Sequence, residues 1–243
     1  MSDLKSIQET AVFDRHAKDY EVAHDHALPP TVESRHFLEQ KVYWVRTWVQ
    51  SRYASNAPVR LLDFGCSVGR VLEGVLTLPQ IKRAVGVDES ETSLDWAKTR
   101  GSLAQDARVN FCKDLSQIES QERFDLVLVF NVLHHVPPEA RSEVLKSLIA
   151  RMNPQGSLVI WEHNRWNPLT RLLVKICPFD EGVVLLSRSA LLNVGSKLGL
   201  KVVEASYVNV TPPHWHRFFL FFGIEKLLAG IPLGAQWRVV FER

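Results

Sequence analysis

Short apolar runs alternate with amphipathic stretches over most of the chain. Five runs have the length and composition of buried strands, at 59–64, 83–87, 109–112, 124–130 and 157–161. Three stretches between them carry apolar residues at helical spacing, at 70–78, 92–100 and 139–152. Strands that alternate with helices form a parallel sheet with helices on both faces, so the pattern predicts an α/β fold.

The two ends of the chain follow a different pattern. Near the N-terminus, apolar spacing predicts a short helix at 13–20 and a longer one at 32–53, separated by a Pro-Pro pair. Near the C-terminus, 201–210 and 235–241 are strand-like, and the apolar segment 215–228 between them predicts a further helix.

The turn after the first predicted strand carries the clearest chemical signal. Asp63 stands at the carboxyl end of that strand, and Gly65 and Gly69 bracket the turn into the next helix. Such a turn brings backbone N–H groups beside a ligand, at the edge where open α/β sheets bind their ligands. Asp88 ends the second strand, nineteen residues after Gly69, where an acid can hold both hydroxyls of a ribose. These residues predict a nucleoside-cofactor site.

The glycine spacing argues against a dinucleotide. A G-x-G-x-x-G fingerprint would need glycine at 65, 67 and 70, but positions 67 and 70 are serine and arginine. The observed pattern, Asp63-x-Gly65-Cys66-x-x-Gly69, resembles motif I of the class I S-adenosylmethionine (SAM)-dependent methyltransferases, whose cofactor has no phosphate. A nicotinamide-dependent oxidoreductase would share the sheet and is the alternative.

Further motifs in matching order extend the resemblance over roughly 13–243. Residues 124–127 and 131–136 resemble the fourth-strand motif of small-molecule methyltransferases, of the type 11 and type 12 kind. Residues 152–159 resemble the lead into their fifth strand, and 13–20 resembles the cap helix of the ubiquinone and cyclopropane branches. The resemblance implies a Rossmann-like, seven-stranded, mostly parallel sheet in the order 3-2-1-4-5-7-6, with the last strand antiparallel and N-terminal cap helices.

The resemblance also implies how the chain is organised. A single methyltransferase domain would cover residues 1–243. Its parts would be N-terminal cap helices at 1–57, a cofactor-binding core at 58–164, a substrate-side insertion at 165–186 and the C-terminal part of the sheet at 187–243.

The implied cofactor is SAM, with S-adenosylhomocysteine as its product. The residues that match cofactor-binding positions are Asp63, Gly65, Cys66, Gly69, Asp88, Glu89, Asp114, Leu115, Asn131, Val132 and Tyr20. Asp88 matches the ribose-binding acid and Asp114 the acid that meets the adenine amino group, although Asp114 could instead cap a short helix. Cys66 is alternatively a small core residue, and Tyr20 is alternatively a core tyrosine.

Two histidines follow the fourth predicted strand and are candidate catalytic residues. His134 or His135 could act as general base on a substrate hydroxyl, because histidine titrates near neutral pH. The alternative, which we favour more for His135, is an imidazole that packs and holds a loop. His163, Asn164 and Arg171 are candidate substrate contacts, and Arg171 suits a carboxylate, phosphate or sugar.

The resemblance implies methyl transfer to a small molecule by in-line displacement. We expect an oxygen acceptor on a metabolite, sugar or lipid-linked intermediate. The alternatives are N- or C-methylation of a secondary metabolite, and a SAM-binding module without catalytic activity. No metal site is predicted, because the His-x-His pair at 214–216 has no carboxylate or further histidine at ligand spacing.

Composition and charge indicate which partners and which compartment to expect for the chain. The chain has 243 residues, 46% of them apolar, and 29 basic against 27 acidic residues, which gives no argument for nucleic acid as a partner. The three cysteines are far apart and favour free thiols in a reducing compartment. Residues 1–10 lack an apolar signal core, so a cytoplasmic location is expected. We expect a monomer or a homodimer. The apolar run at 218–222 is too short for a span of about 20 residues, although peripheral membrane contact is an alternative.

Overall fold

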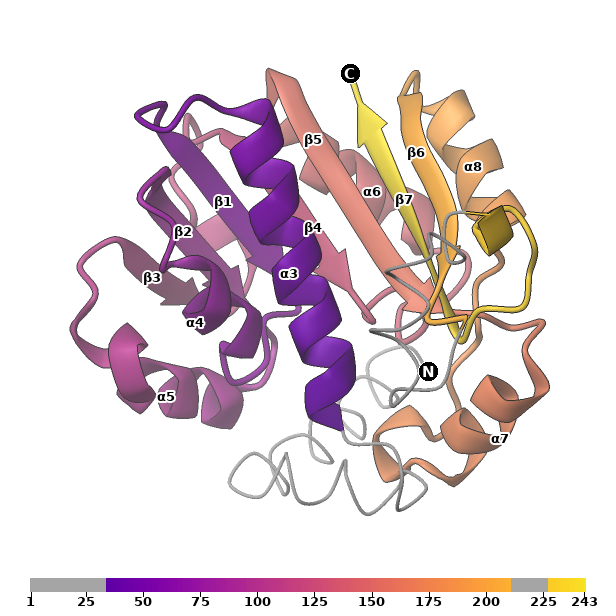
Figure 1. Cartoon of the computed structure of the whole chain (residues 1–243). Coiled ribbons are helices and arrows are strands. Elements are labelled where there is room, and N and C mark those ends of the chain that lie inside the picture. Colours follow the sequence, from indigo (N-terminus) through magenta and orange to yellow (C-terminus); the bar gives the residue numbers. More distant parts are fainter. Residues whose placement is uncertain (1–33, 211–226) are drawn as a thin grey trace. The chain divides into compact units, whose positions relative to one another are not determined.

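The computed structural model describes residues 34–210 and 227–243 (Figure 1). The chain forms two compact units, Met1–Val127 and Leu128–Arg243, and their boundary falls inside strand β4 (Phe124–Phe130). The strands form one seven-stranded sheet in the order β3-β2-β1-β4-β5-β7-β6. This order confirms the predicted Rossmann-like α/β class.

The first unit contains the parallel part of the sheet around the glycine turn. Its strands are β1 (Val59–Phe64), β2 (Ile81–Val87) and β3 (Val109–Cys112). They pair in parallel, with Leu62 opposite Val85 and Val85 opposite Asn110. Leu61 and Leu62 are both fully buried, as expected for adjacent residues of a strand that is covered on both faces.

The described residues of this unit, from 34 onward, include three helices. They are α3 (Ser34–Arg52), α4 (Arg70–Val75) and α5 (Glu91–Thr99), and a 3₁₀ turn, η1 (Gly101–Gln105), follows α5. The predicted apolar stripe of α3 is buried at Val45 and Val49. Helices α3 and α4 approach closely at Gly74, where an added Cβ would lie 2.7 Å from the Val42 side chain. Ser90 caps α5, because its side chain accepts a hydrogen bond from the Ser93 N–H.

The second unit contains the antiparallel part of the sheet. Its strands are β5 (Met152–His163), β6 (Lys201–Val208) and β7 (Gln236–Glu242). Strand β7 runs antiparallel to both neighbours, and Val239 pairs with Ile160 on one side and Ala205 on the other. The predicted antiparallel last strand is thus confirmed.

The described residues of the second unit include helices α6 (Arg141–Ala150), α7 (Pro168–Ile176) and α8 (Arg188–Lys197) and a 3₁₀ turn, η3 (Pro178–Asp180). A further 3₁₀ turn, η2 (Leu115–Gln117), belongs to the first unit. Helix α8 packs beside β6 and β7 (Figure 1). Gly195 allows this approach, since an added Cβ would lie 2.5 Å from the Phe241 ring.

Several boundaries differ from the predictions. The helix predicted at 70–78 ends at Val75, and β5 begins at Met152 rather than at 157 because its first residues are polar and hide the strand pattern. Helices α7 and α8 were not predicted.

The predicted helix at 13–20, and residues 215–226 of the one predicted at 215–228, lie outside the described residues. Within 34–210 and 227–243, no helix is long and apolar enough to cross a membrane.

Candidate functional site

The glycine turn of the first unit is hydrogen-bonded to the end of β2. The N–H groups of Gly65 and Cys66 donate to the Val87 carbonyl at 2.7 and 3.0 Å, and the Gly69 N–H donates to the Cys66 carbonyl at 2.9 Å. Gly65 and Gly69 have φ of 77° and 78°, a left-handed conformation that glycine adopts without steric cost. Ser67 shares this conformation with φ of 48°.

Asp88 joins this turn to the start of α5. Its Oδ2 accepts a hydrogen bond from the Ser67 N–H at 2.7 Å, and its Oδ1 accepts one from the Ser90 N–H at 3.1 Å. The carboxylate is therefore held in one orientation by the backbone. A carboxylate held in this way at the ligand edge of the sheet suits the hydroxyls of a ribose.

Asp63 is a buried acid that lacks a full set of partners. Its residue is 2% exposed, and its Oδ2 has no hydrogen-bond partner among the residues that the structure describes. Burial, and then the nearby Asp88 carboxylate, raise the pKa of Asp63 to about 7. A cationic ligand would relieve both effects, and SAM carries two positive groups, its sulfonium and its amino group. The environment of Asp63 therefore fits the cofactor that the sequence implies.

Cys66 packs inside the first unit. It is 6% exposed, and a Cβ added at Gly86 would lie 2.8 Å from its Sγ, which shows how closely the thiol approaches β2. Burial, followed by the Asp88 and Asp63 carboxylates, raises the pKa of the Cys66 thiol well above its ordinary value. Such a thiol is not a nucleophile at neutral pH. Its burial agrees with the alternative of a small core residue, and contact with the cofactor stays a prediction.

Asp114 caps a short helix, which is the alternative that the sequence left open. Its Oδ1 accepts a hydrogen bond from the Ser116 N–H at 2.7 Å at the start of η2, and this bond lowers the pKa of Asp114. Asp114 and Glu89 are exposed and Leu115 is half-buried. Their contacts with adenine and ribose stay predictions.

In the second unit, one buried carboxylate organises the loop that follows β4. Glu162, on β5, is 1% exposed. Its Oε1 accepts hydrogen bonds from the N–H groups of Val132 and Leu133 at 3.0 and 2.7 Å, and its Oε2 lies 2.6 Å from His134 Nδ1. The loop turns sharply at Asn131, whose φ is 57°. Glu162 thus fixes three consecutive residues of the loop.

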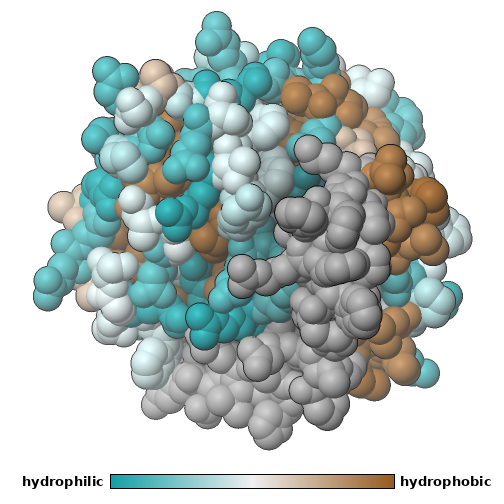
Figure 2. Space-filling model, viewed as in Figure 1, coloured by the Kyte–Doolittle hydropathy of each residue, from teal (hydrophilic) through white to brown (hydrophobic). Residues whose placement is uncertain are grey.

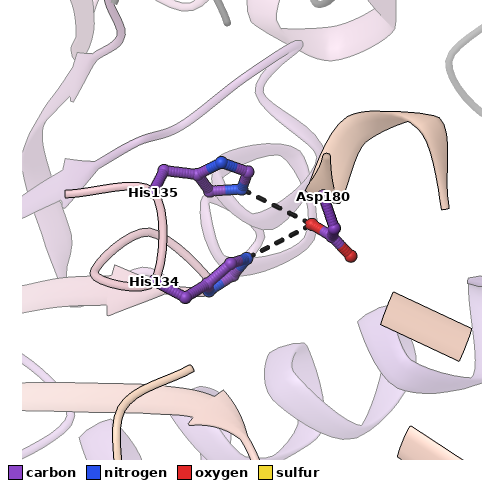
Figure 3. Close-up of side chains that lie close together, drawn as sticks. All are labelled: His134, His135 and Asp180. Carbon is purple, nitrogen blue, oxygen red and sulfur yellow. Dashed lines mark hydrogen bonds and ion pairs between the residues drawn. The ribbon is translucent and has the colours of Figure 1, made fainter. Parts of the chain in front are cut away.

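His134 lies between two carboxylates. Its Nδ1 faces Glu162, and its Nε2 is 3.3 Å from Asp180 Oδ1 (Figure 3). Burial alone would lower the pKa of His134, but the Glu162 and Asp180 carboxylates outweigh it and raise this pKa to about 10. Burial alone would raise the pKa of Glu162, but the positive charge of His134 outweighs this effect and lowers the pKa to about 2. His134 is therefore an imidazolium at neutral pH.

His135 has the opposite charge state. Its Nε2 is 3.6 Å from the same Asp180 oxygen (Figure 3). Burial, and then the positive charge of His134, lower the pKa of His135 to about 3. His135 therefore stays neutral and keeps a nitrogen lone pair, whereas both nitrogens of His134 carry protons and cannot accept another. The sequence assigned the structural role more readily to His135, and the catalytic role of either histidine stays a prediction.

The same three side chains could hold a metal ion. His134, His135 and Asp180 offer ligand atoms that all lie within 4.8 Å of one another. An ion would have to displace the proton of His134, and the cluster already contains an imidazolium to balance its carboxylates. Sequence reasoning missed this grouping because Asp180 is far along the chain from the two histidines. The prediction that the chain binds no metal stays a prediction.

The predicted substrate residues have different surroundings. His163 Nε2 lies 3.0 Å from Asn131 Nδ2, and its ring is 5.1 Å from that of His134, so His163 joins the cluster. Asn164 is fully buried, and its amide donates to the carbonyls of residues 232 and 234 and accepts from the N–H of residue 166. That side chain anchors a loop. Arg171 is exposed on α7, and Tyr20 lies outside the described residues.

The fold and the glycine turn define a class of protein, the class I SAM-dependent methyltransferases. A family model described as a methyltransferase domain matches residues 36–205. That segment exceeds half of the chain, so the chain belongs to the methyltransferase domain family.

Solved structures share the fold. A SAM-dependent methyltransferase from Mesorhizobium loti is 18% identical with a TM-score of 0.59, over 85% of this chain and 100% of that one. Magnesium protoporphyrin IX methyltransferase from Synechocystis PCC 6803, crystallised with S-adenosylhomocysteine, is 17% identical with a TM-score of 0.60, over 84% of this chain and 82% of that one.

A curated relative is more similar in sequence over a shorter segment. The ubiquinone biosynthesis O-methyltransferase of Bradyrhizobium diazoefficiens is 31% identical over 117 residues, which are 48% of this chain and 45% of that protein. The match thus spans about half the length of the curated relatives.

The charged state of His134 predicts how stability depends on pH. The raised pKa of His134 stabilises the fold fully below about 6.5, and this contribution is lost as pH rises through about 10. The lowered pKa of Glu162 stabilises it fully above about 4.5, and this contribution is lost as pH falls through about 2. The unfolding free energy of the wild type should therefore fall between pH 7 and 10.

His134→Gln should lower stability by about 3–5 kcal/mol at neutral pH, because it leaves buried carboxylates unpaired, and should flatten the alkaline fall. Asp180→Asn, which keeps the pair with Glu162, should have a smaller effect, and His36→Gln on α3 is the matched control. Urea unfolding across pH measures this. An alkaline fall in His134→Gln as large as that of the wild type would contradict a charged His134. A smaller fall above about pH 9 is expected in both proteins, because the pKa of the buried Cys66 thiol is raised.

Proposed function

We propose that this protein is a SAM-dependent methyltransferase that moves a methyl group to an oxygen of a small-molecule acceptor. The observation that carries the proposal is the buried Asp63 carboxylate, short of partners, beside a glycine turn that Asp88 holds in place. Membership of the methyltransferase domain family supports it.

The hydrogen bonds of the turn support SAM over a dinucleotide. A pyrophosphate needs free backbone N–H groups at the glycine turn. Here the N–H groups of Gly65, Cys66, Ser67 and Gly69 all donate within the fold. What the turn offers instead is carboxylate, at Asp63 and Asp88, which suits the positive groups and the ribose hydroxyls of SAM.

In this proposal Asp63, Gly65, Cys66 and Gly69 line the cofactor at motif I, and Asp88 binds the ribose. The sequence-based assignments for the adenine end and the methionine end are kept as predictions; they are Glu89, Asp114, Leu115, Asn131, Val132 and Tyr20. When bound, SAM would supply an electrophilic methyl group, so the chain has to orient the acceptor and exclude water.

An oxygen acceptor requires that a proton leaves the hydroxyl. Of the two candidate histidines, His134 is held as a cation, whereas His135 is neutral but a weak base, because its pKa is lowered to about 3. We assign His135 as a hydrogen-bond acceptor that orients the hydroxyl, and His134 as the residue that positions the loop. The proton passes to solvent as the methyl group is transferred. The name of the O-methyltransferase from Bradyrhizobium diazoefficiens supports oxygen as the methylated atom. We retain a cytoplasmic location as part of the proposal.

The cofactor assignment predicts the effect of one substitution. Asp88→Asn should weaken S-adenosylhomocysteine binding by about 10- to 100-fold, because hydrogen bonds to a charged group contribute about 1.5–3 kcal/mol. Asp95→Asn, on the exposed side of α5, is the matched control and should bind like the wild type. Isothermal titration calorimetry measures both. Equal affinity in wild type and Asp88→Asn would overturn the assignment of Asp88.

The acceptor assignment predicts the product. Labelled-methyl assays with panels of phenols, alcohols, amines and carbon acids should give O-methylated products. His135→Gln should lower kcat by about tenfold while leaving S-adenosylhomocysteine affinity unchanged, since a lost hydrogen bond between neutral groups costs about 0.5–1.5 kcal/mol. Products methylated only on nitrogen or carbon would overturn the choice of oxygen. Full kcat in His135→Gln would overturn its role alone.

A further inference from the structure

Helix α7 presents an apolar face to solvent. Leu169, Leu172 and Ile176 are 55%, 55% and 57% exposed, and their spacing places them on one side of the helix. The side that packs on the protein is different, because Thr170 and Val174, four residues apart, are the buried positions. An amphipathic helix of a globular protein normally turns its apolar stripe to the core, so this helix has the reverse orientation.

The exposed apolar surface continues beyond the helix. The Asn167 side chain donates to the Leu233 carbonyl at 2.8 Å, and Thr170 Oγ1 donates to the Ala235 carbonyl at 2.9 Å, so the segment before β7 lies against the start of α7. Leu233 is 57% exposed, and Trp166, just before the helix, is 61% exposed. Figure 2 shows hydrophobic surface at the lower right, where α7 lies in Figure 1. Extended apolar patches of this kind mark interaction sites.

Positive charge accompanies the apolar face. Arg165, Arg171 and Lys175 are exposed, and the chain has no acidic residue from 165 to 179. Arg171 and Lys175 are four residues apart and line one flank of the apolar stripe. A second copy of the chain, docked face to face, would bring these cations together and repel. A surface with an apolar centre and negative charge fits better, and an anionic lipid bilayer has both properties.

We propose that α7 and residues Ile231–Leu233 form a docking surface for anionic lipid bilayers. The side chains of Trp166, Leu169, Leu172 and Ile176 enter the interface, and the cations meet lipid headgroups. The docking does not depend on the proposed activity. The same insertion carries Asp180, which contacts His134, so docking would bring a membrane-embedded acceptor towards that cluster; this last step rests on the proposed function.

Vesicle co-sedimentation of the full chain tests the proposal. The wild type should bind vesicles of phosphatidylglycerol and phosphatidylcholine, and bind phosphatidylcholine alone at least tenfold more weakly. The double variant Leu172→Asp, Ile176→Asp should lose binding to both kinds of vesicle. The double variant Arg171→Gln, Lys175→Gln should bind anionic vesicles at least tenfold more weakly, since each cation near the surface contributes about fivefold. Its binding should also depend less on salt, with Arg165 as the remaining cation of the surface.

Trp96→Asp is the matched control, because Trp96 on α5 is also an exposed apolar residue, 41% accessible. It should bind vesicles like the wild type, and all variants should unfold at the wild-type temperature because the substituted side chains are exposed. Absence of wild-type binding, or full binding by Leu172→Asp, Ile176→Asp, would overturn the proposal. So would a dimer that this double variant dissociates, because the face would then be a self-association surface. Calorimetry with S-adenosylhomocysteine on the same samples reports separately on the proposed function.

Discussion

The burial of the Glu162 carboxylate is the constraint on which the second unit's candidate site depends. A buried charge is tolerated only when it is paired and hydrogen-bonded, and Glu162 meets both conditions with two backbone N–H groups and the His134 ring. Because β5 fixes Glu162, the loop after β4 is fixed as well. The protonated His134 then attracts Asp180 to its other side, so one carboxylate determines the charge states of its neighbours.

The two acidic residues of the first unit differ in their hydrogen bonding, and this difference distinguishes a structural role from a ligand-binding role. Asp88 is satisfied by the backbone and shapes the glycine turn, whereas Asp63 is buried at the end of β1 without a full set of partners. A group that costs stability in the folded protein and lies at the ligand edge of the sheet suits a binding role. Glu162 and Asp88 hold loops in place. The pKa of Asp63 is raised despite the nearby charge of Lys41, so a further positive charge from a ligand would stabilise its carboxylate.

The sequence predicted the strands and their order because buried strands are continuous apolar runs and the motifs match a known family. It also predicted that Asp63 and Asp88 lie at the same edge of the sheet. It did not predict the grouping of Asp180 with His134, because a contact between distant loops leaves no local pattern. Helix α7 was not predicted because it is only nine residues long, and its apolar residues, three of which are exposed, do not form a stripe that faces the core.

The measurement that tests the buried ion cluster most directly is ¹⁵N NMR of the histidine rings. At about pH 8, well above the ordinary histidine pKa of about 6.5, His134 should carry protons on both ring nitrogens, while His135 should carry one. The assignment of the signals can use His134→Gln and His135→Gln. A His134 ring that loses its second proton below pH 8 would contradict the cluster described here, and with it the distinct roles of the two histidines.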